Sequence, residues 1–258
     1  AGNNVGVGYY ALKANTTGTR NVALGANALD ANTVGGKNVA LGMDALGLNV
    51  DGSRSVAVGD SALAAQEPAS AVDMYNTAVG HGAGAAVTTG VQNTLIGGIA
   101  GDVLTTGFNN VAVGFEALSA DTLGSQNTAI GTRALKTQNF TSATNSYNTG
   151  VGYSAGTAIT TGVQNTYVGG LAGDAVVDGT NNVGIGFEAL SADHGSGETA
   201  VGTRALKVST ADNNTAVGLN ALTANTTGTN NVAVGKDAGA SVTTGINNTL
   251  IGAESGDA

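Results

Sequence analysis

Residues 21–42 read NVALGANALDANTVGGKNVALG, so the pentapeptide NVALG returns after 17 residues. Related pentapeptides, of the form Asn, Val or Thr, Ala, an aliphatic residue and Gly, begin fifteen times, the first at Asn4 and the last at Asn248. Ten of the fourteen intervals between them are 17 residues, two are 21 and two are 16. Because the repeats fill the chain from end to end, the sequence predicts a single repeat array over residues 1–258.

When the Asn is counted as position 0, several positions hold one kind of residue throughout. Position 3 is aliphatic and position 4 is Gly in all fifteen copies, position 7 is Ala in fourteen, and position 8 is Leu in nine and Gly in six. Position 14 is Gly in each of the ten 17-residue copies. Glycine at a fixed position marks a corner, where the backbone needs a positive φ or approaches another segment closely. The expected corner glycines include Gly8, Gly25, Gly42, Gly59, Gly80, Gly97, Gly114 and Gly131. The expected structural core is formed by the position 3 residues Val7, Leu24, Leu41, Val58, Val79, Ile96, Val113, Ile130, Val151, Val168, Ile185, Val201, Val217, Val234 and Ile251.

The length of the unit restricts the fold class. A unit of 17 residues is too short for helix pairs or propeller blades, whose repeats span about 33–45 residues. Cores such as Val-Ala-Val and Thr-Ala-Ile favour short strands, in which apolar residues are two apart. The sequence therefore predicts an all-β fold, a parallel β-solenoid (β-roll) of about 15 coils. Each coil is expected to hold a strand, a corner, a second short strand through Ala-Leu, and a turn.

The alternation of the strand predicts two different faces. Residues at positions 1 and 3 point to one side, and residues at positions 0, 2 and 4 point to the other. We expect the larger aliphatic side chains inside the coil. The Asn, Ala and Gly residues would then form a small, flat outer face, which either packs against a partner chain or meets solvent. We also expect the Asn column to form a ladder of stacked amides, each bonded to the next coil's amide.

A longer period lies over the coils. Four-coil super-repeats begin near residues 4, 76, 148 and 214, and the fourth coil of a block carries an irregular segment. Insertions in repeat proteins tend to lie on one face, often the binding face. We expect exposed contact loops in the first two of these segments, although tolerated drift in a corner is the alternative. The residues of these loops are Gln66, Glu67, Pro68, Met74, Tyr75, Phe140 and Tyr147.

Composition excludes several classes of function. Nine basic residues against eighteen acidic ones give a net charge of −9, which argues against binding of nucleic acid. The absence of cysteine removes disulfides and thiolate metal sites. No apolar run approaches the roughly 20 residues of a membrane-spanning helix, so we expect no membrane insertion. The chain begins with Ala1, and we expect it to be processed or excised from a longer protein.

Several catalytic motifs match the sequence only through the repeat. The stretches 6–11 and 184–189 fit the dinucleotide fingerprint, 152–156 fits the nucleophile elbow, and 59–63 looks like a hydrolase motif. All of these matches fall on repeat positions that lack the required functional residues in the other coils. A hydrolase also needs a base, and the two histidines, His81 and His194, lie in different columns. The carboxylates are scattered as well, so we predict that the chain is not an enzyme and has no cofactor and no metal.

The unit N-[VT]-A-[VIL]-G-x-x-A-[LG] resembles the head repeats of trimeric autotransporter adhesins and, in its longer form, repeats of phage tail-fibre proteins. The resemblance covers essentially the whole chain. It implies a left-handed parallel β-roll in which three chains wrap one axis, and an extracellular location on a bacterial cell surface or a virion. The coil is longer than the adhesin-head coil, which leaves handedness and cross-section open.

These observations favour a structural fibre segment, a homotrimer that spaces or presents an attachment surface. Its partners would be further copies of itself and a cell-surface receptor or glycan. One alternative is a subunit of an open extracellular filament that stacks end to end as a homopolymer. Another is an ice-binding solenoid, suggested by a column of threonines near position 12 that includes Thr16, Thr33, Thr88 and Thr105.

Overall fold

The structure, a computed structural model, describes residues 2–257. No helix occurs among these residues, and the fold is a parallel β-solenoid of about 15 coils with a repeat of about 17 residues, which confirms the predicted fold class. The chain divides into two compact units, and each is described by itself. Unit 1 comprises residues 2–127 and 139–145, and unit 2 comprises residues 128–138 and 146–257.

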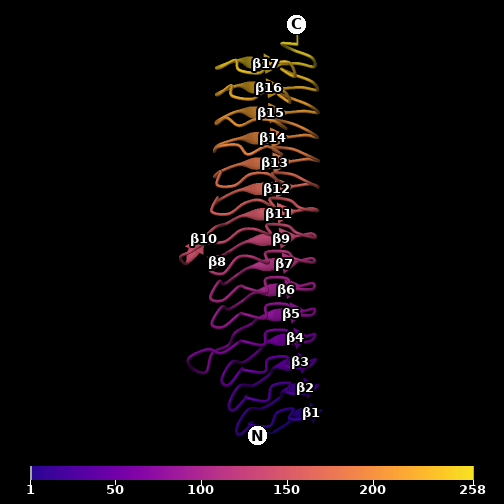
Figure 1. Ribbon diagram of the computed structural model, residues 1–258, viewed down its shortest axis with the longest axis vertical. Helices are drawn as coiled ribbons and strands as arrows, with labels where there is room; N and C mark the ends of the chain where they lie inside the picture. The colour runs from indigo at the N-terminus through magenta and orange to yellow at the C-terminus, as the bar shows by residue number, and fades with distance from the viewer. Residues whose placement is uncertain (1, 258) are drawn as a thin grey trace. The chain divides into compact units, whose positions relative to one another are not determined.

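In unit 1, seven three-residue strands pair in parallel and in chain order (Figure 1). Their register has no shift, because Val22, Ala23 and Leu24 lie opposite the same repeat positions of the next coil. A second, two-stranded parallel sheet lies apart from the seven strands in Figure 1. The strands of unit 1 are β1 (Val5–Val7), β2 (Val22–Leu24), β3 (Val39–Leu41), β4 (Val56–Val58), β5 (Thr77–Val79), β6 (Thr94–Ile96), β7 (Val111–Val113), and the pair β8 (Gly124–Ser125) and β10 (Thr144–Asn145).

Unit 2 repeats this arrangement with eight strands. They also pair in parallel without a register shift, so that Thr166, Tyr167 and Val168 lie opposite Val183, Gly184 and Ile185. The strands of unit 2 are β9 (Thr128–Ile130), β11 (Thr149–Val151), β12 (Thr166–Val168), β13 (Val183–Ile185), β14 (Thr199–Val201), β15 (Thr215–Val217), β16 (Val232–Val234) and β17 (Thr249–Ile251).

The interior of the coils is formed by small residues, which corrects the expected core. Ala23 at position 2, Ala28 at position 7 and Leu29 at position 8 are fully buried, whereas Leu24 at position 3 is 50% exposed. The fifteen position 3 residues from Val7 to Ile251 are all half-buried or exposed. The alternation was predicted, but inside and outside are exchanged. A 17-residue coil encloses a narrow space, and that space is filled by Ala, Leu and Asn side chains.

Asn at position 0 lies inside the coil, where its side chain bonds mainly to backbone. Asn21 Nδ2 donates to the carbonyl of Gly35 at 2.8 Å, and Asn21 Oδ1 accepts the N–H of Asn38 in the next coil at 2.9 Å. The same two bonds recur in both units. A few amides also bond to one another, such as Asn165 to Asn148 at 3.2 Å. The expected ladder is therefore largely one of amides bonded to backbone, which pairs polar groups that the short strands leave free.

The position 4 glycines lie at corners that no other residue can occupy without strain. All eight of the named corner glycines have φ between 129° and 140°. A Cβ at Gly25 would overlap the carbonyl oxygen of Gly42 in the next coil. At position 14 the close approach alone requires glycine, since a Cβ at Gly35 would overlap the carbonyl oxygen of Gly52.

The Ala-Leu segment forms turns, so the expected second strand is absent from these coils. Positions 6 and 8 have positive φ, as at Asn27 (56°) and Leu29 (51°). The segment still bonds from coil to coil, because Leu29 N–H donates to the carbonyl of Ala45 at 3.1 Å. A left-handed conformation costs roughly 1–2 kcal/mol for an ordinary residue. Full burial of the leucine side chain, which contributes about 1.5–3 kcal/mol, offsets this strain.

Candidate interaction surfaces

The residues at positions 1 and 3 of the strands form what we call the outer sheet face. Position 1 is Val or Thr and position 3 is Val, Leu or Ile, so neither column contains a charged residue. Large apolar side chains extend the face at position 5, where Phe115 is half exposed and its ring would contact a Cβ on Gly98 of the preceding coil. Phe187 and Gly170 repeat that arrangement in unit 2. Position 3 thus forms a continuous aliphatic column in each unit, although position 5 also holds Asp60, His81 and Lys236.

The irregular segments are more buried than the sequence suggests. Gln66 is fully buried, and its Oε1 accepts hydrogen bonds from Ser55 Oγ at 3.1 Å and from Asn76 Nδ2 at 2.9 Å. Met74 and Phe140 are also buried. The extra residues therefore anchor each segment to the interior, which corrects the expectation of exposed contact loops at these three positions.

The remaining predicted loop residues divide between buried and exposed. Pro68 is buried, and Glu67 is half-buried with its Oε2 accepting the N–H of Val50 at 2.6 Å. Tyr75 and Tyr147 are 50% and 51% exposed. Of the seven predicted contact residues, the two tyrosines are the exposed ones.

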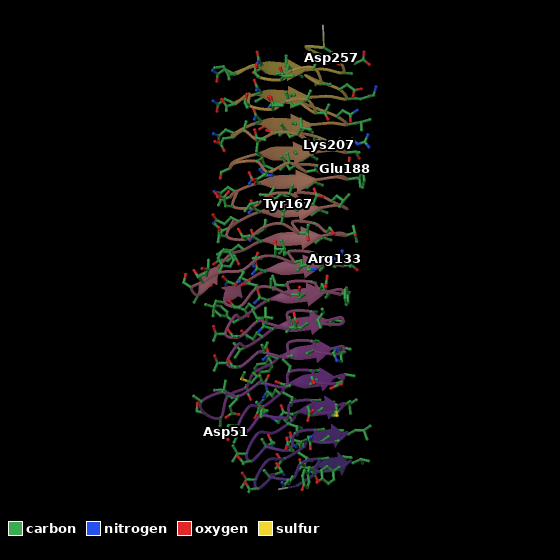
Figure 2. The ribbon with its side chains drawn as sticks, viewed as in Figure 1. Asp51, Arg133, Tyr167, Glu188, Lys207 and Asp257 are labelled. Carbon is green, nitrogen blue, oxygen red and sulfur yellow. The ribbon has the colours of Figure 1, made fainter. Side chains whose placement is uncertain are left out.

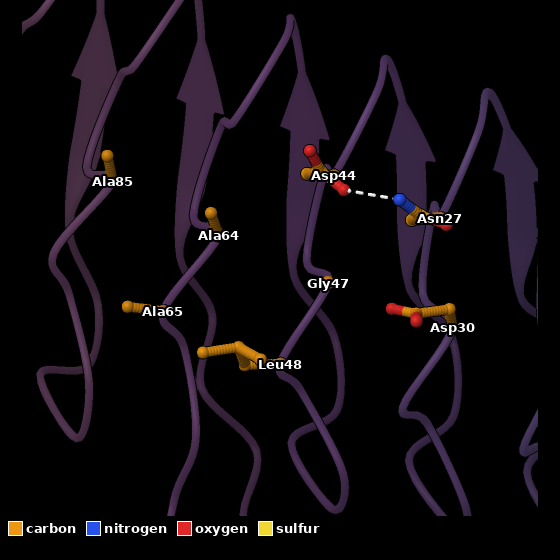
Figure 3. A pocket seen from close by; sticks show the side chains of 8 residues that line it. All are labelled: Asn27, Asp30, Asp44, Gly47, Leu48, Ala64, Ala65 and Ala85. Atoms are coloured by element: carbon orange, nitrogen blue, oxygen red, sulfur yellow. Dashed lines mark hydrogen bonds between the residues drawn. The ribbon is translucent and has the colours of Figure 1, made fainter.

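A shallow hollow of about 340 Å³ lies on unit 1 beside the turn segments of four coils. Figure 3 shows it between Leu48, the small side chains of Ala64 and Ala85, and the polar pair Asn27 and Asp44, whose Nδ2 and Oδ1 atoms are 2.9 Å apart. Its lining offers no nucleophile next to a base. Within residues 2–257 no group of three or more His, Asp and Glu side chains could hold a metal ion.

Ser61, the serine of the hydrolase-like motif at 59–63, bonds to a carboxylate and not to histidine. Ser61 Oγ donates to Asp60 Oδ1 at 2.9 Å, and His81 Nε2 is 4.0 Å from the other oxygen of that carboxylate. Activation of a serine requires a base that accepts its proton directly. Here the hydroxyl bonds to the carboxylate, and the imidazole is largely exposed.

Charged side chains gather along one edge of unit 2 (Figure 2). Lys207 Nζ and Arg204 Nε lie 2.7 Å and 2.9 Å from Glu188 Oε2. Lys207, followed by Arg204, holds the pKa of the Glu188 carboxyl below its usual value. Because solvent screens ion pairs at a surface, this cluster has little effect on the free energy of unfolding.

Unit 2 also contains a cluster of three buried polar side chains, Tyr167, His194 and Glu198, which sequence reasoning missed. Tyr167 replaces the usual Ala at position 2 and is fully buried, with its ring 6.4 Å from that of His194 in an edge-on arrangement. Glu198 replaces Asn at position 0 and accepts a bond from Asn214 Nδ2 at 3.0 Å. Tyr167 Oη, His194 Nε2 and Glu198 Oε2 have no hydrogen-bond partner within the described residues. The sequence did contain a signal, because Tyr167 and Glu198 depart from the residues that positions 2 and 0 usually hold.

Burial controls the ionisation of these groups. It lowers the pKa of His194 to about 4, against weaker opposing effects of the Gly195 carbonyl and nearby carboxylates. It raises the pKa of Glu198 to about 8, opposed by the bond from Asn214. Burial also raises the pKa of Tyr167 above its usual value. At neutral pH the imidazole is therefore neutral and the carboxyl of Glu198 holds a proton.

Comparison with protein-family models, with curated proteins and with solved structures gives no match. In the part of the chain that the structure describes, no helix is long and apolar enough to cross a membrane.

Proposed function

We propose that the chain is a structural segment of an extracellular fibre, on a bacterial surface or a virion, in which copies associate to space or present an attachment surface. The observation that carries this proposal is the outer sheet face, a charge-free strip on which every three-residue strand of each unit presents an aliphatic residue at position 3 and Val or Thr at position 1. Monomeric soluble proteins rarely expose continuous apolar patches larger than a few hundred Å².

Stiffness within a unit follows from bonds at many points of each coil. Backbone groups bond between coils at the strand and at the Ala-Leu turn, and the Asn column adds its two bonds. The threonine column contributes too, since Thr105 Oγ1 donates to the carbonyl of Thr122 at 2.8 Å. These threonine hydroxyls donate hydrogen bonds to the neighbouring coil. This supports a mechanical role and gives no support to ice binding.

The size of the outer sheet face suits association between copies. Of the fourteen side chains at positions 1 and 3 of β1 to β7, five are exposed and nine are half-buried, so unit 1 offers a face of seven coils for contact. A stable interface buries about 800 Å² on each partner. Three copies that share this face around one axis would form the homotrimer that the repeat resemblance implies.

Sedimentation velocity over a hundredfold range of concentration tests this proposal. We expect one species near three times 24.9 kDa for the unchanged chain. The double variant Leu24→Lys with Leu41→Lys should sediment as a monomer, because it places two charges on the outer sheet face. The control variant Thr17→Lys with Val34→Lys adds the same charge at exposed positions outside that face and should remain a trimer.

A monomer of the unchanged chain at every concentration would contradict the proposal. A distribution that grows with concentration would instead favour the end-to-end filament. Equal dissociation by both double variants would show that added charge, and not the outer sheet face, controls association.

A further inference from the structure

Three successive coils of unit 1 carry a cation at the position just before the Asn column. Arg20, Lys37 and Arg54 have φ of 61°, 62° and 63°. Each donates its backbone N–H to the preceding coil, as Lys37 does to Thr19 at 2.9 Å. Because the coils are parallel and in register, the three side chains leave equivalent backbones one coil apart, which is about 4.8 Å. We call these three residues the cationic row.

The cationic row is unusual for this chain. The same position holds Asn, Gln, Tyr or Gly in the other twelve coils, and the chain as a whole has a net charge of −9. Like charges on neighbouring strands repel one another and destabilise the fold. Arg54 pairs with Asp73 at 2.9 Å, and no ion pair among the described residues involves Arg20 or Lys37. An anionic ligand would relieve this repulsion.

A hollow of about 150 Å³ lies between these cations. Its lining includes Lys37 and Arg54, the small residues Thr19, Gly36 and Ser53 of consecutive coils, and Asp73, whose carboxylate is paired with Arg54. A Cβ at Gly36 would lie 3.0 Å from the carbonyl oxygen of Thr19, which is a tight contact. The hollow thus combines Lys37, which has no ion-pair partner among the described residues, with hydroxyl groups that can bond to a polar ligand.

An aromatic ring ends the cationic row. Tyr75 occupies the same repeat position in the next coil, is 50% exposed, and lies with its ring centroid 5.5 Å from the Arg54 guanidinium. Cations bind carboxylates and sulfates through charge-assisted hydrogen bonds. An exposed tyrosine offers an apolar ring with a polar tip, which suits the face of a sugar.

We infer that the cationic row, its hollow and Tyr75 form a binding site for a linear acidic saccharide with a carboxylate on successive sugars. The cations recur at the spacing of the coils, about 4.8 Å, so a chain with a carboxylate on successive sugars can contact more than one of them. The inference rests on the proposed function, since it names the ligand class that a presenting fibre would bind.

Isothermal titration calorimetry of the full chain with a six-sugar oligouronate at low salt tests the inference. The double variant Arg20→Gln with Lys37→Gln should bind at least about tenfold more weakly. Glutamine occupies the same repeat position at Gln92, with φ of 59°, so the backbone is retained. The control variant Lys13→Gln with Lys236→Gln removes equal charge elsewhere and should bind like the unchanged chain.

Two further measurements define the ligand class. Tyr75→Asn should weaken binding of the oligouronate but not of inorganic sulfate, because only the sugar contacts the ring. Binding of single-stranded DNA as tight as that of the oligouronate would overturn the saccharide assignment.

No binding by the unchanged chain, or equal loss in both double variants, would overturn the site itself. Sedimentation of the same samples separates this result from the proposed function, because a monomer that binds the oligouronate refutes the trimer and leaves the site intact.

Discussion

The coils around Leu95 in unit 1 and around Tyr167 in unit 2 occupy the same place in duplicated blocks, 72 residues apart, yet their interiors differ. Both side chains are fully buried, but Tyr167 brings a hydroxyl that has no hydrogen-bond partner among the described residues. The neighbouring coils hold Ala78 and Ala112 beside the leucine, but Gly150 and Gly184 beside the tyrosine. The repeat therefore accepts a larger side chain when the adjacent coils lose two methyl groups.

In both places a glycine at position 8 also leaves space for the larger side chain. A Cβ at Gly101 would lie 2.9 Å from Leu95 Cδ2, while a Cβ at Gly173 would overlap the ring of Tyr167. Close packing makes interiors sensitive to even a single methyl group. The comparison teaches that positions 2 and 8 vary together in these two places, so that a larger side chain in one coil meets smaller residues around it.

The largest effect on stability is expected from Gly173→Ala, which removes the space that the Tyr167 ring occupies. The added methyl overlaps the Tyr167 ring and occupies a φ of 60°, so we expect a loss of about 3 kcal/mol in the free energy of unfolding. Denaturant titration measures it. Tyr167→Leu in the same chain should restore most of the loss, since leucine at this position tolerates the smaller space. If Gly101→Ala proves equally damaging, the ring is not the cause.

A smaller effect, which depends on pH, is expected from Glu198→Gln. The pKa of Glu198 rises from its ordinary 4.5 to about 8 in the fold, so the unfolded carboxyl ionises first and stability falls as pH rises between these values. The glutamine variant lacks this fall, so between pH 6.5 and 8 it should lose about 2 kcal/mol less of its free energy of unfolding than the unchanged chain. Unfolding measured from pH 6.5 to 8 checks this, in a range where His194 of the folded chain stays neutral and the unfolded imidazole titrates alike in both proteins. The same slope in both proteins would refute the assignment.

The smallest effect is expected from Tyr167→Phe, which removes the unpartnered hydroxyl and keeps the ring. A buried polar group without a bond costs about 1–3 kcal/mol, and we expect a gain of about 1 kcal/mol in the free energy of unfolding. Thermal unfolding measures it, with Tyr153→Phe at an exposed site as the matched control. A loss of stability would show that the hydroxyl has a partner, such as a buried water.

The sequence predicted the coil length, the parallel stacking and the corner glycines. All three can be read from the glycines, because they recur once per coil at places where no other residue fits. The prediction of which side of the strand lies inside was wrong. Ala23 and Leu24 are both apolar, so alternation alone cannot decide between them. The narrow width of the closed coil determines which side faces inward, and this width depends on all residues of the coil.

The candidate surfaces were predicted in part. The exposed tyrosines Tyr75 and Tyr147 were found from the irregular segments. Gln66 and Met74 were misplaced, because an insertion in a repeat conceals whether its ends return to the interior. The cationic row was missed, since its members lie 17 residues apart and become neighbours only when coils stack in register.

The coil-to-coil bonds of the Asn column also have a mechanical consequence. Within each unit most Asn residues of the column accept the N–H of the following coil, as Asn21, Asn93 and Asn148 do, so these coils are fastened to their neighbours by the same kind of bond. Under tension on the chain, the outermost coil of a unit would detach before the next one bears load. Each event would release 17 residues, or about 60 Å of extended chain. Force would then be dissipated in many small, equal steps, and the unloaded chain would rewind onto the edge of the coil that remains.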